Sequence, residues 1–325
     1  MSNRYSTIQL PDGAVLAYEI HGSFHRGTRI PIVLVCGMSN LRIDYERLTG
    51  SLSQTRPVLI YDHRGMGESC LAHNEDLSIE MLARDLAFLL HALRWKEVSI
   101  CGYSMGGVIA QQLLVLPYHP THPIQLEFRT THLFLVATRS VVQEKVGIDY
   151  KPPPTGATRT LAEKKAGARR IIESTFDPKW ITENGARLNI ICERVFRSIS
   201  NRPGEVIAKQ GTALQNFNFA GLLSKLPTNM KVLVVHGNMD RVIPRHCGED
   251  IRARIRGAVF LESGPRPGQV PSLDFGHNWY EYFDIKVWQN VVDSFIDDGC
   301  LLHSSDDYVI SRYLENPGLC TPSAE

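Results

Sequence analysis

A serine placed between two glycines is the feature of this sequence that most directly indicates chemistry. Gly102, Ser104 and Gly106 have the spacing Gly-x-Ser-x-Gly, and they follow a short apolar run at 98–101. In a sharp turn from strand to helix, glycine avoids the collisions that a Cβ would make with the neighbouring elements. The turn would expose the Ser104 hydroxyl at the start of a helix, where backbone N–H groups favour negative charge. We therefore interpret Ser104 as a nucleophile.

A serine nucleophile needs a base to take its proton and an acid to orient that base. Asp240 follows the apolar run 231–236 and precedes Pro244, which suits the first turn of a helix. Capping that helix is the alternative role for Asp240. The loop after the run 131–137 offers only residues 138–140, none of which is acidic. Asp240 is the predicted acid.

The base is expected in a loop before the last predicted helix, 279–297. His277 has that position, although the sequence contains 12 histidines. His63, directly after the run 57–61, is the best alternative. Asp274 is a rival acid, but it lies three residues from His277 in the same loop and is poorly placed to orient that ring from across a cleft. Position therefore favours His277 as the base.

The oxyanion of an acyl-transfer reaction needs two preorganised hydrogen-bond donors. The residue after the nucleophile, Met105, supplies one backbone N–H. The apolar run 30–36 ends in a flexible Gly37-Met38 turn, whose second residue would supply the other. We expect the amides of Met38 and Met105 to form the oxyanion hole.

Alternating strand-like and helical patterns are expected to position these residues. The expected strands are 7–10, 14–20, 30–36, 57–61, 98–101, 131–137, 231–236 and 257–261, and the expected helices include 78–93, 161–175, 180–199 and 279–297. Strands that alternate with helices predict a parallel, doubly wound sheet. In such sheets reactive groups collect at the carboxyl ends of the strands, where Gly37, Asp62 and Ser104 lie. From about 139 to 226 no strand-like run occurs, which suggests a helical lid inserted into the sheet domain.

Composition is typical of a large folded protein. The chain has 325 residues, of which 43% are apolar and 21% charged, and its formal net charge is +1. This balance gives no reason to expect nucleic acid or an anionic membrane as a partner. There is no secretory signal and no apolar run of the ~20 residues that a membrane span requires, so we expect a soluble cytoplasmic protein. Seven scattered cysteines without a Cys-x-x-Cys pair predict neither a disulfide framework nor a zinc site.

Taken together, these motifs resemble the α/β-hydrolase family. The matching segments are 36–38, 62–69, 102–107, 236–240 and 276–277. The resemblance implies a mostly parallel eight-stranded sheet with helices on both faces and an inserted helical cap. It assigns 1–138 and 227–298 to the core and 139–226 to the cap. Residues 299–325 have no counterpart in the family and are expected to form a C-terminal extension. The resemblance also implies the triad Ser104, Asp240 and His277, with no metal and no cofactor.

Two departures from the family pattern bear on function. Cys36 stands where the family usually has histidine, which matters little because the oxyanion donors are backbone groups. A serine nucleophile in place of aspartate argues against epoxide hydrolases and dehalogenases.

The aromatic residues of the expected cap suggest an apolar pocket, although helix packing accounts for most of them equally well. They are Phe176, Trp180, Phe196, Phe217 and Phe219.

The expected function is a serine hydrolase that cleaves esters or lactones of small, largely apolar molecules through an acyl-enzyme. Its pocket is expected to include Gly37, Tyr103, Trp180 and Phe217. One alternative keeps the triad but cleaves a carbon–carbon bond, as in β-diketone hydrolases, and an acyltransferase is a close variant. A binding protein or receptor built on the same fold is the alternative from another class. The sequence leaves the oligomeric state open.

Overall fold

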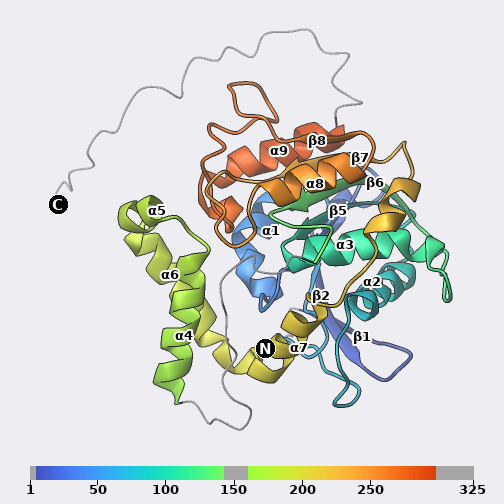
Figure 1. The fold of residues 1–325 in the computed structure, drawn as a ribbon, viewed down its shortest axis with the longest axis horizontal. Coiled ribbons are helices and arrows are strands. Elements are labelled where there is room, and N and C mark those ends of the chain that lie inside the picture. Colours follow the sequence, from blue (N-terminus) through green and yellow to red (C-terminus); the bar gives the residue numbers. More distant parts are fainter. Residues whose placement is uncertain (1–4, 143–159, 298–325) are drawn as a thin grey trace.

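A single eight-stranded sheet organises the protein in the computed structural model, which describes residues 5–142 and 160–297 (Figure 1). The strands are β1 Ser6–Gln9, β2 Val15–His21, β3 Ile32–Val35, β4 Val58–Tyr61, β5 Glu97–Tyr103, β6 Arg129–Val136, β7 Lys231–Val235 and β8 Ala258–Phe260. Their order in the sheet is β1-β2-β4-β3-β5-β6-β7-β8. Strand β2 pairs antiparallel with β1 and β4, and the other pairs are parallel. The predicted mostly parallel eight-stranded sheet is confirmed.

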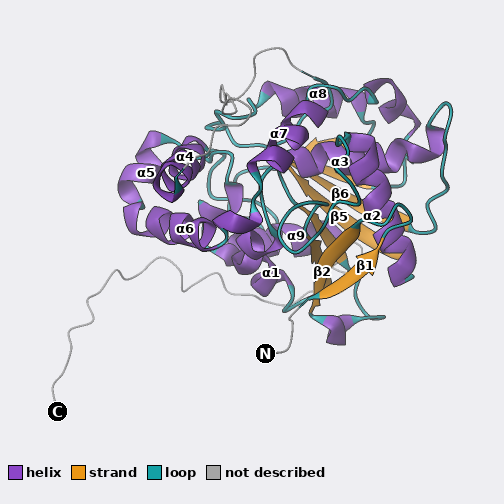
Figure 2. Ribbon diagram, turned by 90° about the horizontal axis from the view of Figure 1, so that it is seen from below, coloured by secondary structure: helices purple, strands orange, loops and turns teal. Residues whose placement is uncertain are grey.

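Helices cover both faces of the sheet (Figure 2). The α-helices are α1 Glu46–Leu52, α2 Ile79–Leu93, α3 Met105–Val115, α4 Leu161–Ser174, α5 Pro178–Glu183, α6 Gly185–Arg197, α7 Gly204–Ala213, α8 His246–Arg254 and α9 Ile285–Asp297. Short 3₁₀ helices include η2 Arg42–Tyr45, η4 Ile199–Asn201, η5 Ala220–Lys225 and η6 Trp279–Glu281. Among the described residues, no helix combines the length and apolar character that crossing a membrane would require.

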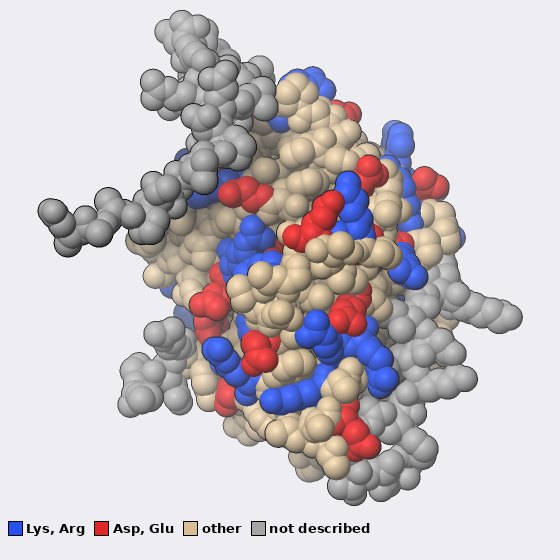
Figure 3. Space-filling model, turned by 90° about the vertical axis from the view of Figure 1, so that its left-hand side faces the viewer, with Lys and Arg blue, Asp and Glu red and all other residues tan. Residues whose placement is uncertain are grey.

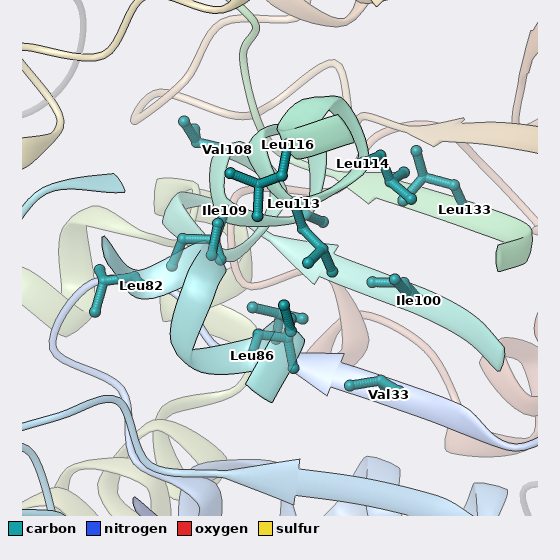
Figure 4. Close-up of a cluster of buried hydrophobic side chains, with 14 of the residues drawn as sticks. Val33, Leu82, Leu86, Ile100, Val108, Ile109, Leu113, Leu114, Leu116 and Leu133 are labelled. Atoms are coloured by element: carbon teal, nitrogen blue, oxygen red, sulfur yellow. The ribbon is translucent and has the colours of Figure 1, made fainter. Parts of the chain in front are cut away.

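Successive strand residues point to opposite faces, and each face has its own core. In β3, Val33 and Val35 contribute to the core under α2, α3 and α8, whereas Ile32 and Leu34 contribute to the core under α1 and α9. Figure 4 shows the first of these cores, where leucines of α2 and α3 pack over β3, β5 and β6. Because the central strands are buried on both faces, they read as continuous apolar runs in the sequence.

Two expected helices are interrupted in the structure. The expected helix 180–199 is divided at Asn184 into α5 and α6. The backbone of Asn184 is not helical there (φ −123°, ψ 32°), and its side-chain amide donates to the carbonyl of Trp180 at 3.1 Å. The expected helix 279–297 is divided into η6 and α9. Here Asp284 accepts a hydrogen bond from the amide of Lys286 at 2.8 Å and begins α9.

Between β6 and β7 the described chain is helical, and residues 160–226 are here called the helical insertion. In Figures 1 and 2, α4, α5 and α6 stand beside the sheet, whereas α7 lies nearer to α3. Helices α4–α6 share a small apolar core around Phe176 and Trp180. From Ala213 onward the insertion packs into the main core instead, through residues that include Phe219 and Leu223. The expected cap range, 139–226, therefore ends in residues that pack with the sheet domain.

The face that carries the helical insertion shows basic and acidic side chains interspersed rather than gathered into a patch of one sign (Figure 3). Pairs four residues apart on its helices, such as Arg169 with Glu173 and Lys179 with Glu183, contribute to this mixture. This face therefore lacks the strong single-sign field that steers polyanionic partners.

Candidate active site

Ser104 occupies the junction between β5 and α3 in a strained backbone conformation. Its φ is 54° and its ψ is −119°, in a region that non-glycine residues rarely adopt. Such a conformation costs of order 1–3 kcal/mol and persists only where neighbours fix it. Here the amide of Ser104 donates to the carbonyl of Val136 at 2.9 Å, and the hydroxyl of Thr138 donates to the carbonyl of Ser104 at 2.6 Å. The end of β6 and the residues that follow it thus hold the turn that exposes the serine.

The glycines on either side of Ser104 are needed for space. A Cβ on Gly102 would lie 2.6 Å from the carbonyl oxygen of Gly106, and a Cβ on Gly106 would overlap the carbonyl of Val35. Neither glycine has a positive φ, so the unusual dihedral angle of the turn belongs to Ser104 itself. The close approach of α3 to β3 and β5 explains the Gly-x-Ser-x-Gly spacing.

His277 lies between the side chains of Ser104 and Asp240. Its Nε2 is 3.1 Å from Ser104 Oγ, and its Nδ1 is 2.9 Å from Asp240 Oδ2. Since a carboxylate only accepts hydrogen bonds, Nδ1 carries the proton in this network, and Nε2 of the neutral ring is free to accept from the serine. The ring is buried, and its centroid lies 5.0 Å from that of Tyr103. The structure therefore brings together all three residues that the sequence nominated.

Asp240 is fixed by hydrogen bonds to both of its carboxylate oxygens. While Oδ2 faces His277, Oδ1 accepts from the amides of Val242 and Ile243, both at 2.9 Å. Burial opposes ionisation of this carboxyl. The attraction of His277 and the hydrogen bonds from His236 and His277 nevertheless hold the pKa of Asp240 well below its usual value. Helix α8 begins only at His246, so Asp240 stabilises the preceding turn and does not cap that helix.

The rival candidates lie elsewhere. His63 is buried and donates from Nε2 to the carbonyl of Cys36 at 2.9 Å, and burial lowers its pKa to about 4. Asp274 is exposed and accepts from the side-chain amide of Asn238 at 2.9 Å. Both residues make structural contacts outside the group formed by Ser104, Asp240 and His277. Among the described residues, no cluster of three or more His, Cys, Asp or Glu side chains could hold a metal ion.

The loop after β3, residues 37–40, approaches the serine closely and is here called the oxyanion loop. A Cβ on Gly37 would lie 3.2 Å from Ser104 Cβ and 3.1 Å from a ring carbon of Tyr103. Met38 follows Gly37 in this loop, and Met105 begins α3, where the first amides have no intrahelical acceptor. The two amides expected to bind an oxyanion thus belong to segments that meet at Ser104.

Two residues of the helical insertion contact the oxyanion loop, and no sequence motif pointed to them. Gln210 in α7 accepts a hydrogen bond from the amide of Ser39 at 2.9 Å. Arg202, between η4 and α7, donates to the carbonyl of Ser39. Ser39 itself has a φ of 64°, a left-handed value that is unusual for serine. Contacts across more than 160 positions of sequence leave no local pattern from which they could have been predicted.

The insertion also contacts the loop that carries His277. The amide of Asn278 donates to the carbonyl of Thr175 at 3.2 Å. The hydroxyl of Tyr282 donates to Asp177 Oδ2 at 2.8 Å, and a Cβ on Gly276 would lie 2.5 Å from that hydroxyl. Both neighbours of His277 are therefore packed against the end of α4 and the residues that follow it.

Of the four expected pocket residues, Gly37 and Tyr103 lie beside the serine and the histidine. Trp180 stacks on Phe176 at 3.9 Å between ring centroids, inside the small core of α4–α6. Phe217 stacks on Phe219 at 5.2 Å as part of the core over α3. The described contacts of Trp180 and Phe217 are therefore packing contacts, and their role in a substrate pocket remains a prediction.

The chain is similar to known proteins in both a family model and curated relatives. A family model described as "alpha/beta hydrolase fold" matches residues 29–124, which include β3, β4 and the Ser104 turn. A curated relative from Caulobacter segnis, named "Putative carbamate hydrolase RutD", is 24% identical over 252 residues, which cover 76% of this chain and 87% of the relative.

Solved structures agree on the fold over nearly the whole chain. The esterase RhEst1 from Rhodococcus sp. ECU1013 superposes with a TM-score of 0.66 at 21% identity, covering 91% of this chain and 99% of that structure. The enol-lactonase from Burkholderia xenovorans LB400 has a TM-score of 0.63 at 20% identity, covering 89% and 99%. At such identities the likeness shows a shared fold.

Proposed function

The chain has the α/β-hydrolase fold, and on that premise we propose that it is a serine hydrolase cleaving esters or lactones of small, largely apolar molecules. The observation that carries the proposal is the contact series from Asp240 through His277 to Ser104, at 2.9 and 3.1 Å. This is the arrangement that activates a serine hydroxyl for attack on a carbonyl carbon. The comparisons support a hydrolase, and the choice of bond and substrate is our inference.

In the proposed mechanism, His277 Nε2 takes the proton of Ser104 as Oγ bonds to the substrate carbonyl carbon. The carbonyl oxygen becomes an oxyanion, held by the amides of Met38 and Met105. When the intermediate collapses, the bond to the leaving alkoxide breaks and the proton passes from His277 to that oxygen. Water then attacks the acyl-enzyme, again giving its proton to His277, and releases the carboxylic acid with Ser104 restored.

Asp240 holds the ring of His277 in the required tautomer and stabilises the imidazolium that forms during both steps. Its carboxylate is suited to this because its lowered pKa keeps it ionised at neutral pH. The buried surroundings of Asp240 and His277 strengthen their attraction relative to water. These two side chains thus supply the proton transfers and stabilise the imidazolium.

A carbamate is the second candidate for the substrate, because curated relatives that cover most of this chain are named as carbamate hydrolases. The chemistry differs little, since a carbamate also presents a carbonyl carbon to Ser104. A panel of p-nitrophenyl ester, γ-lactone, aryl carbamate and vinylogous β-diketone substrates separates the four possible bond classes. Highest kcat/KM on the ester or lactone supports the proposal, and highest kcat/KM on the carbamate or diketone overturns its choice of bond.

The test of the nucleophile is Ser104→Ala. We expect turnover of p-nitrophenyl esters to fall by about 10³-fold or more, because the remaining groups can only orient and polarise the ester. A fluorophosphonate probe should label the native protein at Ser104 and leave the variant unlabelled.

Asp274→Asn is the matched control, because this rival acid is exposed and lies outside the contact series. It should retain activity within about twofold, as surface changes away from special features usually do. Retained activity in Ser104→Ala would contradict the assignment. A folded native protein that takes no label and turns over no member of the panel would favour the binding-protein alternative.

A further inference from the structure

We propose that Gln210 and Arg202 of the helical insertion are positioning residues that hold the oxyanion loop in its catalytic geometry. The inference rests on the proposed function, because it assumes that the Met38 amide binds the oxyanion. It extends that function by making the oxyanion hole depend on a segment about 170 positions away in sequence.

The orientation of the Gln210 side chain follows from its partner. Gln210 is fully buried, and its Oε1 lies 2.9 Å from the amide nitrogen of Ser39. Since that amide can only donate, the carboxamide must turn its oxygen toward it. The other end, Nε2, has no hydrogen-bond partner in the part of the chain that the structure describes. Among the described residues, the hydrogen bond that the Gln210 side chain makes is therefore the one to Ser39, which points to this contact as its role.

Arg202 holds the other side of the same residue. Its guanidinium donates to the carbonyl of Ser39 and also pairs with the carboxylate of Asp44 at 2.8 and 2.9 Å. The side chains of Arg202 and Asp44 are both almost fully buried. Asp44 in turn accepts from the amide of Leu41 at 2.9 Å. The Arg202–Asp44 pair thus joins the insertion to both ends of the loop segment 39–41.

These contacts act on Met38 through its peptide bond to Ser39. Gln210 fixes the plane of that peptide, and Arg202 fixes the next one, so Ser39 is held at its left-handed φ of 64° from both sides. Helix α7 also approaches Met38 directly, because a Cβ on Gly211 would lie 4.0 Å from Met38 Sδ. Without the two contacts, Ser39 would relax toward an ordinary conformation and carry the amide of Met38 with it. A displacement of about 1 Å is enough to weaken a preorganised site.

An uncharged acceptor suits this position. A carboxylate in place of Gln210 would also accept from Ser39, but it would set a negative charge beside the place where the oxyanion develops. The positive charge of Arg202 is already neutralised by Asp44. The two side chains therefore hold the loop while leaving stabilisation of the oxyanion to the backbone amides.

The test uses Gln210→Met, which keeps the length of the side chain and removes the acceptor, and Arg202→Met. With a p-nitrophenyl ester, we expect kcat to fall by about 10- to 100-fold in each variant, somewhat less than the loss of a complete oxyanion donor, while KM stays within about twofold. The affinity for a trifluoromethyl ketone, which forms an oxyanion on Ser104, should fall by the same factor as kcat/KM. In the double variant the losses should be less than multiplicative, because both contacts act on Ser39.

Val206→Ala is the control for general damage to α7. Val206 is buried on the same helix and packs with Leu41, Met66 and Leu77. We expect it to lower the melting temperature while leaving kcat and inhibitor affinity unchanged. If Gln210→Met does not fold, Gln210→Asn, which withdraws the acceptor by one methylene, and Arg202→Met decide the question.

The inference is overturned if the variants at positions 210 and 202 keep kcat within twofold of the native value. It is also overturned if they raise KM alone, or if they lose activity only in proportion to lost folded protein. Failure of the proposed function would look different, because either Ser104→Ala would then remain active or the native protein itself would turn over no member of the panel. The two results can therefore be told apart in one series of variants.

Discussion

At the scale of single residues, the two histidines His63 and His277 show how hydrogen-bond partners determine the role of a side chain. His63 and His277 are both buried, yet only His277 contacts a carboxylate and a serine hydroxyl. His63 instead donates to a backbone carbonyl and packs against the ring of Tyr61, and burial lowers its pKa to about 4. The geometry of hydrogen-bond partners, rather than residue type, separates the proposed base from the structural histidine.

The lowered pKa of His63 predicts a particular pH dependence of stability. The folded protein keeps His63 neutral down to about pH 4, whereas the unfolded chain protonates it near its ordinary value of about 6.5. Between these values the unfolded state binds more protons, so stability falls as pH is lowered from 6.5 to 4 and then levels off. Between pH 7 and pH 4, His63 should cost the native protein about 3 kcal/mol of unfolding free energy. The variant His63→Gln keeps an N–H donor but does not titrate, so its unfolding free energy should fall by about 3 kcal/mol less over the same range.

Urea unfolding at several pH values between 4 and 7 measures this difference. The native protein and the variant share every other titrating group, so the change in slope isolates His63. Equal slopes for the two proteins would show that the folded state does not keep His63 neutral.

Ser104, Asp240 and His277 could be nominated from the sequence because each stands directly after a strand or before a helix whose pattern is clear. The Gly-x-Ser-x-Gly spacing can be recognised because α3 packs so closely on β3 that only glycine fits at position 106. Gln210 and Arg202 could not be nominated, because their partner is the backbone of Ser39 and a backbone partner imposes no residue type at the far end of the contact.

At the scale of elements, the close crossing of α3 over the sheet excludes any side chain at position 106. The carbonyl of Val35 occupies the space that any side chain at position 106 would need. Gly106→Ala should therefore destabilise the protein by about 3 kcal/mol or more, because backbone cannot move aside as a flexible side chain can. Thermal and urea unfolding measure the effect.

Gly50 is the matched control for this substitution. It lies within α1, where an added Cβ would meet no atom of another element within 4 Å, and its φ is not positive. Gly50→Ala should stabilise the protein by about 0.5–1 kcal/mol, because it removes conformational freedom from the unfolded chain. Similar effects at the two positions would contradict the packing explanation.

Strands were easier to predict than helix boundaries, and the reason is physical. Strands buried on both faces give continuous apolar runs, so those before Gly37, Asp62 and Ser104 are plain in the sequence. The breaks at Asn184 and Asp284 depend on side chains that compete for backbone groups, which an apolar periodicity does not reveal.

At the scale of the whole molecule, buried ion pairs fasten the helical insertion to the sheet domain. The side chain of Glu281 is fully buried and pairs with Arg187 of α6 at 2.8 and 2.9 Å and with Arg47 of α1 at 3.3 Å. Arg194 approaches the same carboxylate at 3.8 Å. Three cations from two parts of the fold therefore meet at one acid in η6.

Glu281→Ala should destabilise the protein by about 3 kcal/mol, because it leaves partly buried arginines without their partner. Glu183→Ala is the control, since its contact with Lys179 is exposed and 3.9 Å long, and its loss should change stability by at most about 0.5 kcal/mol. Urea unfolding monitored by tryptophan fluorescence compares the two. A small effect at Glu281, like that at Glu183, would show that the buried pairs do not fasten the insertion.

The sequence predicted an insertion between two parts of a sheet domain but not how it is attached. Its expected range, 139–226, rests on the absence of strand patterns, which says nothing about packing partners. The structure divides the described part into α4–α6, with their own apolar core, and a later part that joins the main core from Ala213. Apolar residues of both parts look alike in the sequence, because burial against either surface demands the same side chains.

The long separation between Ser104 and His277, 173 positions, has a consequence for how the protein is made. In the proposed mechanism, a growing polypeptide contains Ser104 long before it contains His277, the group that would deprotonate its hydroxyl. Translation products that end before position 277 would contain the whole Ser104 turn, but they would lack the proposed base and would not attack a carbonyl carbon. In that mechanism, attack on a carbonyl requires that the segment carrying His277 has packed beside Ser104.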